Sequence, residues 1–307
     1  MSFALLIILA AGAERGAPAH PHTAGTAKGL GNTMLDPGTP ATLGKVLRRL
    51  RAREEVRRRE AGTLSPATVF SRDMAAEEAH ISASYMGQLE RDTAVGQVGV
   101  GILRQLVEIY HASEDDWQYV CDLAGHQSPY PGLMGMSPTM EIPSLEQFQN
   151  ALTPIMRTEM DEASTDLVSY YASPQRQLLA ANRRYFEVFP DQEPGLYMLE
   201  WTFSSPAARK IMITWDDDAR LGVAWHRGIM GRYGKTEWAQ QSHRRLWQFS
   251  EFRAMWEAGD VAYAMSEDYE VRVLIDGRPH GMTMENWHLY NDHPAPILRS
   301  RGRIYPL

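Results

Sequence analysis

The chain has 307 residues, of which 44% are hydrophobic and 22% are charged, and its formal net charge at pH 7 is −7. This length and composition are typical of a globular protein with two domains that each bury a core. A single cysteine excludes an internal disulfide and favours a reducing, cytoplasmic location. No apolar run approaches the ~20 residues that span a bilayer, so we expect no membrane partner.

Residues 1–40 are predicted to be a disordered N-terminal extension. Residues 3–11 are apolar, and the small residues at 11–13 have the form of a signal-peptide cleavage site. No lysine or arginine precedes the apolar run, however, and this disfavours secretion. Residues 14–40 are rich in Gly, Pro, Ala, Thr and His and show no periodicity. A translated leader ahead of a start at Met34 is an alternative interpretation.

Residues 43–53 are predicted to form an amphipathic helix with a basic outer face. Between Lys45 and Arg59 there are eight basic residues and two acidic ones. Positive charge that is concentrated on an otherwise acidic chain predicts a surface for a polyanion, and a solvated helix face is the alternative. The opposite face of this helix carries a stripe of apolar residues, which are Leu43, Val46, Leu47 and Leu50. Their i, i+3, i+4 and i+7 spacing is that of one buried helical face.

Residues 74–91 are predicted to form two short helices joined by a tight turn. Ala75, Ala76 and Ala79 are small enough for a second helix to cross closely over the first. Ser82 follows the turn, and its hydroxyl can accept a hydrogen bond from a backbone N–H of the new helix. The pattern therefore indicates a helical hairpin whose second helix begins directly after Ser82.

The second helix of this hairpin has an outer face of small, uncharged residues. Such a face can approach the base edges of DNA without steric block. Gln88 is the best candidate on it for a bidentate contact to adenine. A helical hairpin with no role in DNA binding is the alternative. The four residues that helical spacing leaves on this face are Ala83, Ser84, Gly87 and Gln88.

Two further helices, at residues 101–110 and 113–124, complete an all-α domain that we expect to cover residues 41–126. Each carries a stripe of apolar residues at helical spacing, and Ser113 is a good cap for the second of them. The hairpin then supplies the second and third of five short helices. This order is typical of a compact helical DNA-binding unit.

The sequence Ile81-Ser82, Tyr85 and Leu89-Glu90-Arg91 resembles the XRE-type helix-turn-helix of repressor-like proteins. Asp92 stands where that family commonly has glycine, and the segment 54–73 is longer and richer in arginine than is usual. The resemblance implies a homodimer that binds double-stranded DNA, with the basic residues on phosphates and the hairpin on bases. The residues expected at the DNA are Ser82, Ala83, Ser84, Tyr85, Gly87, Gln88, Arg91, Arg48 and Arg49.

Residues 127–144 are rich in Pro, Gly and Ser and are predicted to be a linker. Residues 145–307 are predicted to form an α+β domain in which helices cover a small antiparallel sheet. Asp276-Gly277 is expected to be a hairpin turn. The predicted helices are at 145–156, in the range 207–233 and in the range 237–257. The predicted strands are at 167–171, 177–182, 261–265, 269–275 and 282–290.

The order of motifs in this second domain resembles the MmyB-like ligand-binding domain. These motifs are Leu178 to Asn182, Phe203 with Arg209 and Trp215, and Ser250 to Phe252 followed by Trp256. The resemblance implies a PAS-like sensor domain attached to an XRE-type helix-turn-helix. It also implies a small apolar ligand, of which a fatty acid is one example.

Candidate ligand-binding residues follow from what an apolar ligand with a carboxylate head would need. One cation should orient the head group, and apolar side chains should supply most of the affinity. Arg209 is the first candidate for the head group and Asn182 is the second, with Trp215, Phe252 and Trp256 as walls. The alternatives are an ion pair of Arg209 with Asp216 or Asp217, a cap role for Asn182, and ordinary core positions for the three aromatic residues.

The sequence carries no motif of a hydrolase, a nucleotide-binding loop or a zinc protease. Asp216-Asp217-Asp218 would point in different directions on a helix, so a solvated face is expected there and not a metal site. We therefore predict a DNA-binding transcription regulator that senses a small apolar ligand and is neither an enzyme nor dependent on a cofactor. The first alternative is a DNA-binding protein whose C-terminal half mediates dimerisation or protein interaction. The second is an enzyme with an attached DNA-binding domain.

Overall fold

The computed structural model describes residues 41–126, 142–263, 269–289 and 296–307. All of these belong to one compact unit, residues 36–307. The predicted N-terminal extension and most of the predicted linker lie outside the described residues. None of the described helices is long and apolar enough to cross a membrane.

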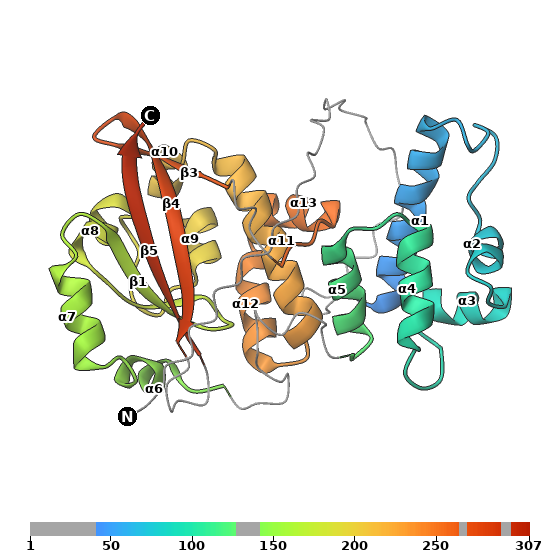
Figure 1. The fold of residues 1–307 in the computed structure, drawn as a ribbon, viewed down its shortest axis with the longest axis horizontal. Helices are drawn as coiled ribbons and strands as arrows, with labels where there is room; N and C mark the ends of the chain where they lie inside the picture. Colours follow the sequence, from blue (N-terminus) through green and yellow to red (C-terminus); the bar gives the residue numbers. More distant parts are fainter. Residues whose placement is uncertain (1–40, 127–141, 264–268, 290–295) are drawn as a thin grey trace. The chain divides into compact units, whose positions relative to one another are not determined.

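The N-terminal part is all-helical, as predicted, and its core is formed by the apolar faces of its helices. Leu47 and Leu50 of the first helix are fully buried in it, together with Met86 of the third and Leu106 of the fourth. The helices, shown in blue to green in Figure 1, are α1 (Leu43–Glu60), α2 (Arg72–Glu78), α3 (Ala83–Glu90), α4 (Val100–Ile109) and α5 (Glu114–Leu123).

Helix α1 is longer than the sequence predicted, because the segment after residue 53 continues as helix. The buried carboxylate of Glu54 accepts hydrogen bonds from Arg57 Nε and Arg58 Nε, each at 2.6 Å. These i, i+3 and i, i+4 pairs lie along one side of the helix and stabilise it. Arginine and glutamate also have high helix propensity. The helix therefore ends at Glu60, just before Gly62, which has a φ of 70°.

The C-terminal part combines helices and strands, which confirms the predicted α+β class. Its first predicted helix, at 145–156, is two helices in the structure. Thr153 caps the second of them and Pro154 takes the first helical position, where its missing N–H costs nothing. The helices are α6 (Leu145–Asn150), α7 (Pro154–Glu162), α8 (Arg183–Val188), α9 (Met198–Ser204), α10 (Pro206–Ile211), α11 (Trp215–Tyr233), α12 (Glu237–Trp247) and α13 (Ser250–Ala258).

Five antiparallel strands form one sheet in the order β2-β1-β5-β4-β3. The predicted hairpin turn at Asp276-Gly277 is confirmed, whereas residues 261–263 are not in a strand and 264–268 lie outside the description. The central strand β5 was not among the strands that the sequence predicted. The strands are β1 (Leu167–Ala172), β2 (Gln177–Ala181), β3 (Val271–Ile275), β4 (Arg278–Leu289) and β5 (Ile297–Pro306).

Strand β1 is covered on both faces and is buried along its whole length. Val168 and Tyr170 of β1 pack with Phe148 of α6 on one face. Leu167 and Tyr171 point to the other face and join a core with α9 and α11. Figure 1 shows α6 and α7 on one side of the sheet and α9 and α11 on the other. This second face holds the cavity described below.

Candidate functional site

Helices α2 and α3 form the predicted hairpin, and α3 begins where the cap chemistry of Ser82 indicated. Ser82 Oγ accepts a hydrogen bond from Tyr85 N at 3.1 Å. Met86 and Leu89 are buried against the other helices. Ser82, Ala83 and Ser84 are exposed, and Tyr85 and Gln88 are partly exposed. The N-terminal end of α3 is therefore open to a partner.

Asp92 fulfils the conformational role of the glycine that it replaces. Its φ is 58°, in the left-handed region that follows many helix ends. Its carboxylate also accepts a hydrogen bond from Gly44 N at 2.7 Å, and so it satisfies a free N–H at the start of α1. Asp92 therefore joins the end of α3 to the beginning of α1.

Most arginines of the basic run bind carboxylates of the protein itself. Arg51 Nε, for example, lies 2.7 Å from Glu90 Oε1, and only 18% of the Arg51 side chain is exposed. Arg48, by contrast, is exposed and has no ion pair among the described residues. The positive charge available to a polyanion is therefore smaller than the sequence suggested. The paired residues are Arg51 with Glu90, Arg53 with Asp116, Arg57 and Arg58 with Glu54, and Arg59 with Glu55.

Arg49, which the sequence placed at the DNA, points into the protein. Its Nη2 atom is buried and has no hydrogen-bond partner among the described atoms. Burial lowers the pKa of its guanidinium, against the opposing influence of Tyr119 and Asp116. Arg49 and Arg48 are adjacent in sequence, but they do not share an exposed face.

Two arginines flank α3 at Gly87. A methyl group added at Gly87 would lie 3.1 Å from Arg91 Nη1 and 3.4 Å from Arg72 Nη1, and these side chains bury Gly87. Arg91 was predicted at this surface, whereas Arg72 was not, because it precedes the hairpin and lies outside the basic run. The two guanidinium groups give the end of α3 a local positive charge.

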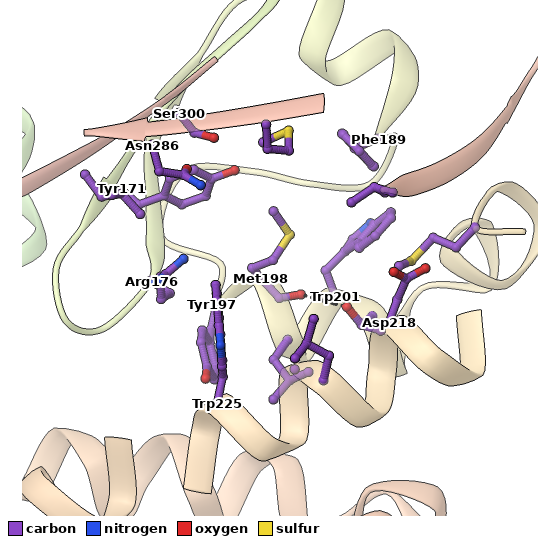
Figure 2. A pocket seen from close by; sticks show the side chains of 18 of the residues that line it. Tyr171, Arg176, Phe189, Tyr197, Met198, Trp201, Asp218, Trp225, Asn286 and Ser300 are labelled. Carbon is purple, nitrogen blue, oxygen red and sulfur yellow. Dashed lines mark hydrogen bonds between the residues drawn. The ribbon is translucent and has the colours of Figure 1, made fainter. Parts of the chain in front are cut away.

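The C-terminal domain contains a cavity of about 210 Å³ between the sheet and helices α9 and α11. Its surface is mainly apolar and includes Met282 and Met284 of β4, Trp201 of α9, and Leu221 and Trp225 of α11. Figure 2 shows these elements surrounding an open space. A concave, mainly apolar space with few polar groups is typical of a small-molecule site.

One end of this cavity carries a partly buried arginine. Arg176 lies in the turn between β1 and β2, and Figure 2 shows its side chain directed into the cavity. Its Cζ atom is 4.2 Å from the ring centroid of Trp225, an aromatic contact that favours a cation. Burial lowers the pKa of Arg176, while the nearby phenols of Tyr197 and Tyr171 act in the opposite direction.

The other end of the cavity carries Asp218, in the first turn of α11. Its carboxylate accepts hydrogen bonds from Thr214 Oγ1, at 3.1 Å, and from the hydroxyl of Tyr269. Burial raises the pKa of Asp218 to about 6. The two charged side chains of the cavity are therefore opposite in sign and lie at opposite ends in Figure 2.

Residues 169–285 match the family model of the MmyB-like transcription regulator ligand binding domain. The matched segment runs from β1 into β4 and includes α9 and α11, which supply much of the cavity wall. No curated protein matches the chain. Residues 169–285 are therefore similar to the ligand-binding domain of transcription regulators, and most residues that line the cavity lie within this segment.

Arg209, which the sequence predicted to bind the head group of a ligand, lies outside the cavity. Its Nη2 atom is 2.5 Å from Glu251 Oε2, and 41% of its side chain is exposed. The guanidinium also lies over the ring of Trp215, with its Cζ atom 3.7 Å from the centroid. Arg209 thus forms an ion pair, but with Glu251 and not with Asp216 or Asp217.

Asn182 has the alternative role that the sequence left open, as a helix cap. Its Oδ1 atom accepts hydrogen bonds from Tyr185 N at 3.0 Å and from Val168 N at 3.2 Å. Its Nδ2 atom donates to the carbonyl oxygens of Ala163 and Asp166. Asn182 is buried, and it holds α8 against β1.

Of the three predicted aromatic wall residues, Trp215 and Phe252 belong to the core of the C-terminal part, and Trp256 packs against that core. Trp215 Nε1 donates to Thr202 O at 3.0 Å, and Phe252 and Trp256 pack around His226 and His243. None of the five predicted ligand residues lines the cavity. The sequence did not single out Arg176, because an arginine in a hairpin turn gives no signal that its side chain lines a cavity.

The described parts of the chain hold no group of three or more His, Cys, Asp or Glu side chains arranged to bind a metal ion. The buried histidines form a pair and not a cluster. His226 Nε2 lies 3.2 Å from His243 Nδ1, and Tyr197 Oη lies 3.0 Å from His226 Nδ1. Burial lowers the pKa of both rings, that of His243 to about 4.

Proposed function

We propose that this protein is a transcription regulator in which residues 41–126 bind double-stranded DNA and residues 145–307 bind a small apolar ligand. The observation that carries the proposal is the apolar cavity inside a domain that matches a transcription-regulator ligand-binding family. The five-stranded antiparallel sheet with helices on both faces supports the PAS-like architecture expected of such a sensor. A fatty acid is the ligand that the apolar surface suits best.

The DNA-binding part of the proposal rests on the hairpin of α2 and α3 as an XRE-type helix-turn-helix. The exposed N-terminal end of α3, with Ser82, Ala83 and Ser84, would face the bases in the major groove. Gln88 would read adenine, and Arg48 and Arg91 would bind phosphates. We expect a homodimer on an inverted repeat, because each copy would present one α3 to one half-site.

Helix α11 supports communication between the cavity and the DNA-binding unit, because it contacts both. Trp225 of α11 lines the cavity. Six residues further along the same helix, a methyl group added at Gly231 would lie 2.5 Å from the ring of Tyr119 in α5. Tyr263 Oη also donates to Asp122 of α5 at 2.7 Å. A ligand that shifts α11 would therefore change the support of the DNA-binding helices, provided that it binds the two states with different affinity.

The DNA-binding proposal is tested by selecting duplexes from a random pool with the full chain and measuring their affinity by fluorescence anisotropy. Gln88→Ala should relax the sequence preference, because it removes a base contact. Arg48→Ala should weaken all duplexes uniformly and lower the slope of log affinity against log salt by roughly one. Arg183→Ala is the control, since this exposed side chain pairs with Glu187 in the other domain. Unchanged binding in both test variants would exclude α3 as the reading helix.

The ligand part is tested by native mass spectrometry of the full chain. A discrete additional mass of lipid or metabolite size, released on denaturation, would support a sensor. If the chain is recovered without a ligand and its DNA affinity does not respond to medium-chain lipids, the C-terminal half is better explained as a dimerisation or interaction module. The cavity favours the first outcome.

A further inference from the structure

We propose that the contact between the helical unit of residues 41–126 and the C-terminal part is a reversible dock, from which Arg49 returns to water when the two parts separate. We name this contact the Arg49 junction. It consists of Arg49 in α1, Tyr119 in α5, Arg227 in α11 and Gly259 directly after α13. The regulatory meaning of the junction rests on the proposed function, whereas the docking itself does not.

The first observation is that Arg49 is packed into the junction without a partner for its charge. It forms no hydrogen bond or ion pair among the described residues, and its Nη2 atom is buried. The nearby carboxylates are those of Asp116 and Asp260. Arg53 already binds Asp116, and Asp260 is exposed to solvent. A guanidinium stays charged in proteins, so its removal from water without a partner is costly. This cost makes the docked arrangement less stable than it would be with a neutral side chain.

The second observation is another arginine beside the first. Arg227 is 2% exposed, and its Nε atom donates to Asp260 O at 2.9 Å. Its guanidinium also lies over the ring of Trp256, with the Cζ atom 4.0 Å from the centroid. Burial lowers the pKa of Arg227, and the charge of Arg49 acts in the same direction. Because Arg227 is held by contacts of its own, repulsion between the two like charges favours the departure of Arg49.

The third observation is that glycines of the C-terminal part make room for the docked side chains. Gly259 is buried and has a φ of 86°, and a methyl group there would overlap the guanidinium of Arg49. A methyl group at Gly231 would lie 2.5 Å from the ring of Tyr119. Surfaces that fit this closely do not deform gradually, so they are either in contact or apart. The junction therefore combines a close fit with an unfavourable charge, which is what a reversible dock requires.

Helix α11 connects the junction to the cavity. Trp225 lines the cavity, and Arg227 follows two residues later on the same helix. A ligand that displaces α11 would change the distance between Arg227 and Arg49, and with it their repulsion. Ligand occupancy would thereby set how freely the DNA-binding helices move, provided that the ligand binds the docked and undocked states with different affinity.

Hydrogen exchange of the full chain, followed by mass spectrometry, measures how often the junction opens. The informative peptides cover α5 and residues 259–263. Arg49→Met removes the charge and keeps a long side chain of similar helix propensity. We expect it to slow exchange in both peptides roughly threefold or more, because the docked state no longer contains an unpaired charge. Arg48→Met is the matched control, since the exposed Arg48 has no place in the junction and its replacement should leave exchange unchanged.

Gly259→Ala should shift the junction in the opposite direction, because the added methyl group overlaps Arg49. We expect the same peptides to exchange roughly threefold or more faster than in the wild type. Alanine is also strained at a φ of 86°, so the substitution is repeated in an Arg49→Ala background, where the overlap is absent. The acceleration that Gly259→Ala causes should fall by roughly half or more in that background.

Two results would overturn the inference. Faster exchange in Arg49→Met than in the wild type would make Arg49 a structural anchor of the docked state. Equal exchange in these two proteins would mean that the charge of Arg49 does not influence docking. Circular dichroism establishes that each variant folds, and Arg49→Leu gives the same comparison if the Met variant does not.

The regulatory role of the junction is tested separately, by fluorescence anisotropy of DNA binding with and without decanoate. We expect Arg49→Met to reduce the effect of decanoate on DNA affinity roughly threefold or more, because the docked state is then favoured in both conditions. An unchanged effect would exclude the junction from the coupling. If the wild type does not respond to decanoate, the ligand part of the proposed function fails, and the exchange measurement still decides whether the junction is a reversible dock.

Discussion

Gly44 lies where the first turn of α1 crosses the end of α3. A methyl group at this position would lie 2.5 Å from Glu90 O and 2.7 Å from Leu89 O, which are backbone atoms that cannot move alone. We therefore expect Gly44→Ala to destabilise the protein by about 1–3 kcal/mol, in spite of the higher helix propensity of alanine. Urea denaturation followed by circular dichroism measures this change.

Gly101 provides a matched control within the same helical unit. It is in α4, and a methyl group there would meet no atom within 4 Å. Gly101→Ala should therefore stabilise the protein by about 0.5–1 kcal/mol, since only the conformational preference changes. Destabilisation by both substitutions to the same extent would contradict the close approach of α1 and α3.

His243 gives the stability of the C-terminal domain a dependence on pH. Burial, followed by the nearby charge of Arg227, lowers its pKa in the folded state to about 4 from the ordinary value of 6.5. Between these two values the unfolded chain binds the proton more readily, so this group makes the protein less stable as the pH falls from 6.5 toward 4. Above 6.5 its contribution is constant.

We therefore expect His243→Gln to lose less stability than the wild type when the pH is lowered from 7 to 5. The measurement is the urea midpoint at several pH values. Asp122→Asn is a control for which the opposite change is expected. Burial raises the pKa of Asp122 to about 6, so the folded state binds this proton more readily than the unfolded chain. The carboxyl group of Asp122 therefore adds stability as the pH falls from about 6 toward 4. Asp122→Asn should steepen the loss at acid pH. Identical pH profiles of all three proteins would contradict these assignments.

At the scale of elements, the end of α1 depends on a single buried carboxylate. Glu54 is 1% exposed and binds both Arg57 and Arg58, while Arg58 also binds Glu78 of α2. Glu54→Ala would leave these arginines without their shared partner, and we expect it to cost about 1–3 kcal/mol and to fray α1 after residue 53. Urea denaturation gives the stability loss, and hydrogen exchange of the α1 amides locates it.

Glu60→Ala is the control for this prediction. Glu60 is also near the end of α1, but it is exposed and forms no ion pair among the described residues. Its removal should change the stability by less than about 0.5 kcal/mol. Similar effects of the two substitutions would mean that the helix end does not depend on Glu54.

Elements that are determined by neighbouring residues, such as helix caps and hairpin turns, could be predicted from the sequence. Features that depend on contacts between segments far apart in the sequence could not. The start of α3 follows from Ser82, and the turn between β3 and β4 follows from Asp276-Gly277. Strand β5 was missed because it alternates arginines with small or apolar residues, and because one of its two partners, β1, is remote in sequence. The residues that line the cavity were not predicted, because they come from β1, β4, β5, α9 and α11, which are separated in sequence.

At the scale of the whole molecule, α5 belongs to the N-terminal helical core and also packs against α11 of the C-terminal part. Tyr119 of α5 is fully buried against α11, and Tyr263 binds Asp122 of α5. We expect Tyr263→Phe to reduce the effect of decanoate on DNA affinity at least threefold, because it removes a contact that connects the cavity side of the domain to α5. Fluorescence anisotropy with and without decanoate measures the effect, and an unchanged ratio of affinities would exclude this contact as part of the coupling.

The place of β5 in the sheet has a consequence for how the protein is made. Ala172 of β1 pairs with Ile297 of β5, so β1 leaves the ribosome long before its main partner exists. Until residues 297–306 emerge, β1 and β4 each expose an unpaired edge, which is a template for association with other chains. We expect this domain to fold late during synthesis and to need a chaperone to protect these edges in the meantime.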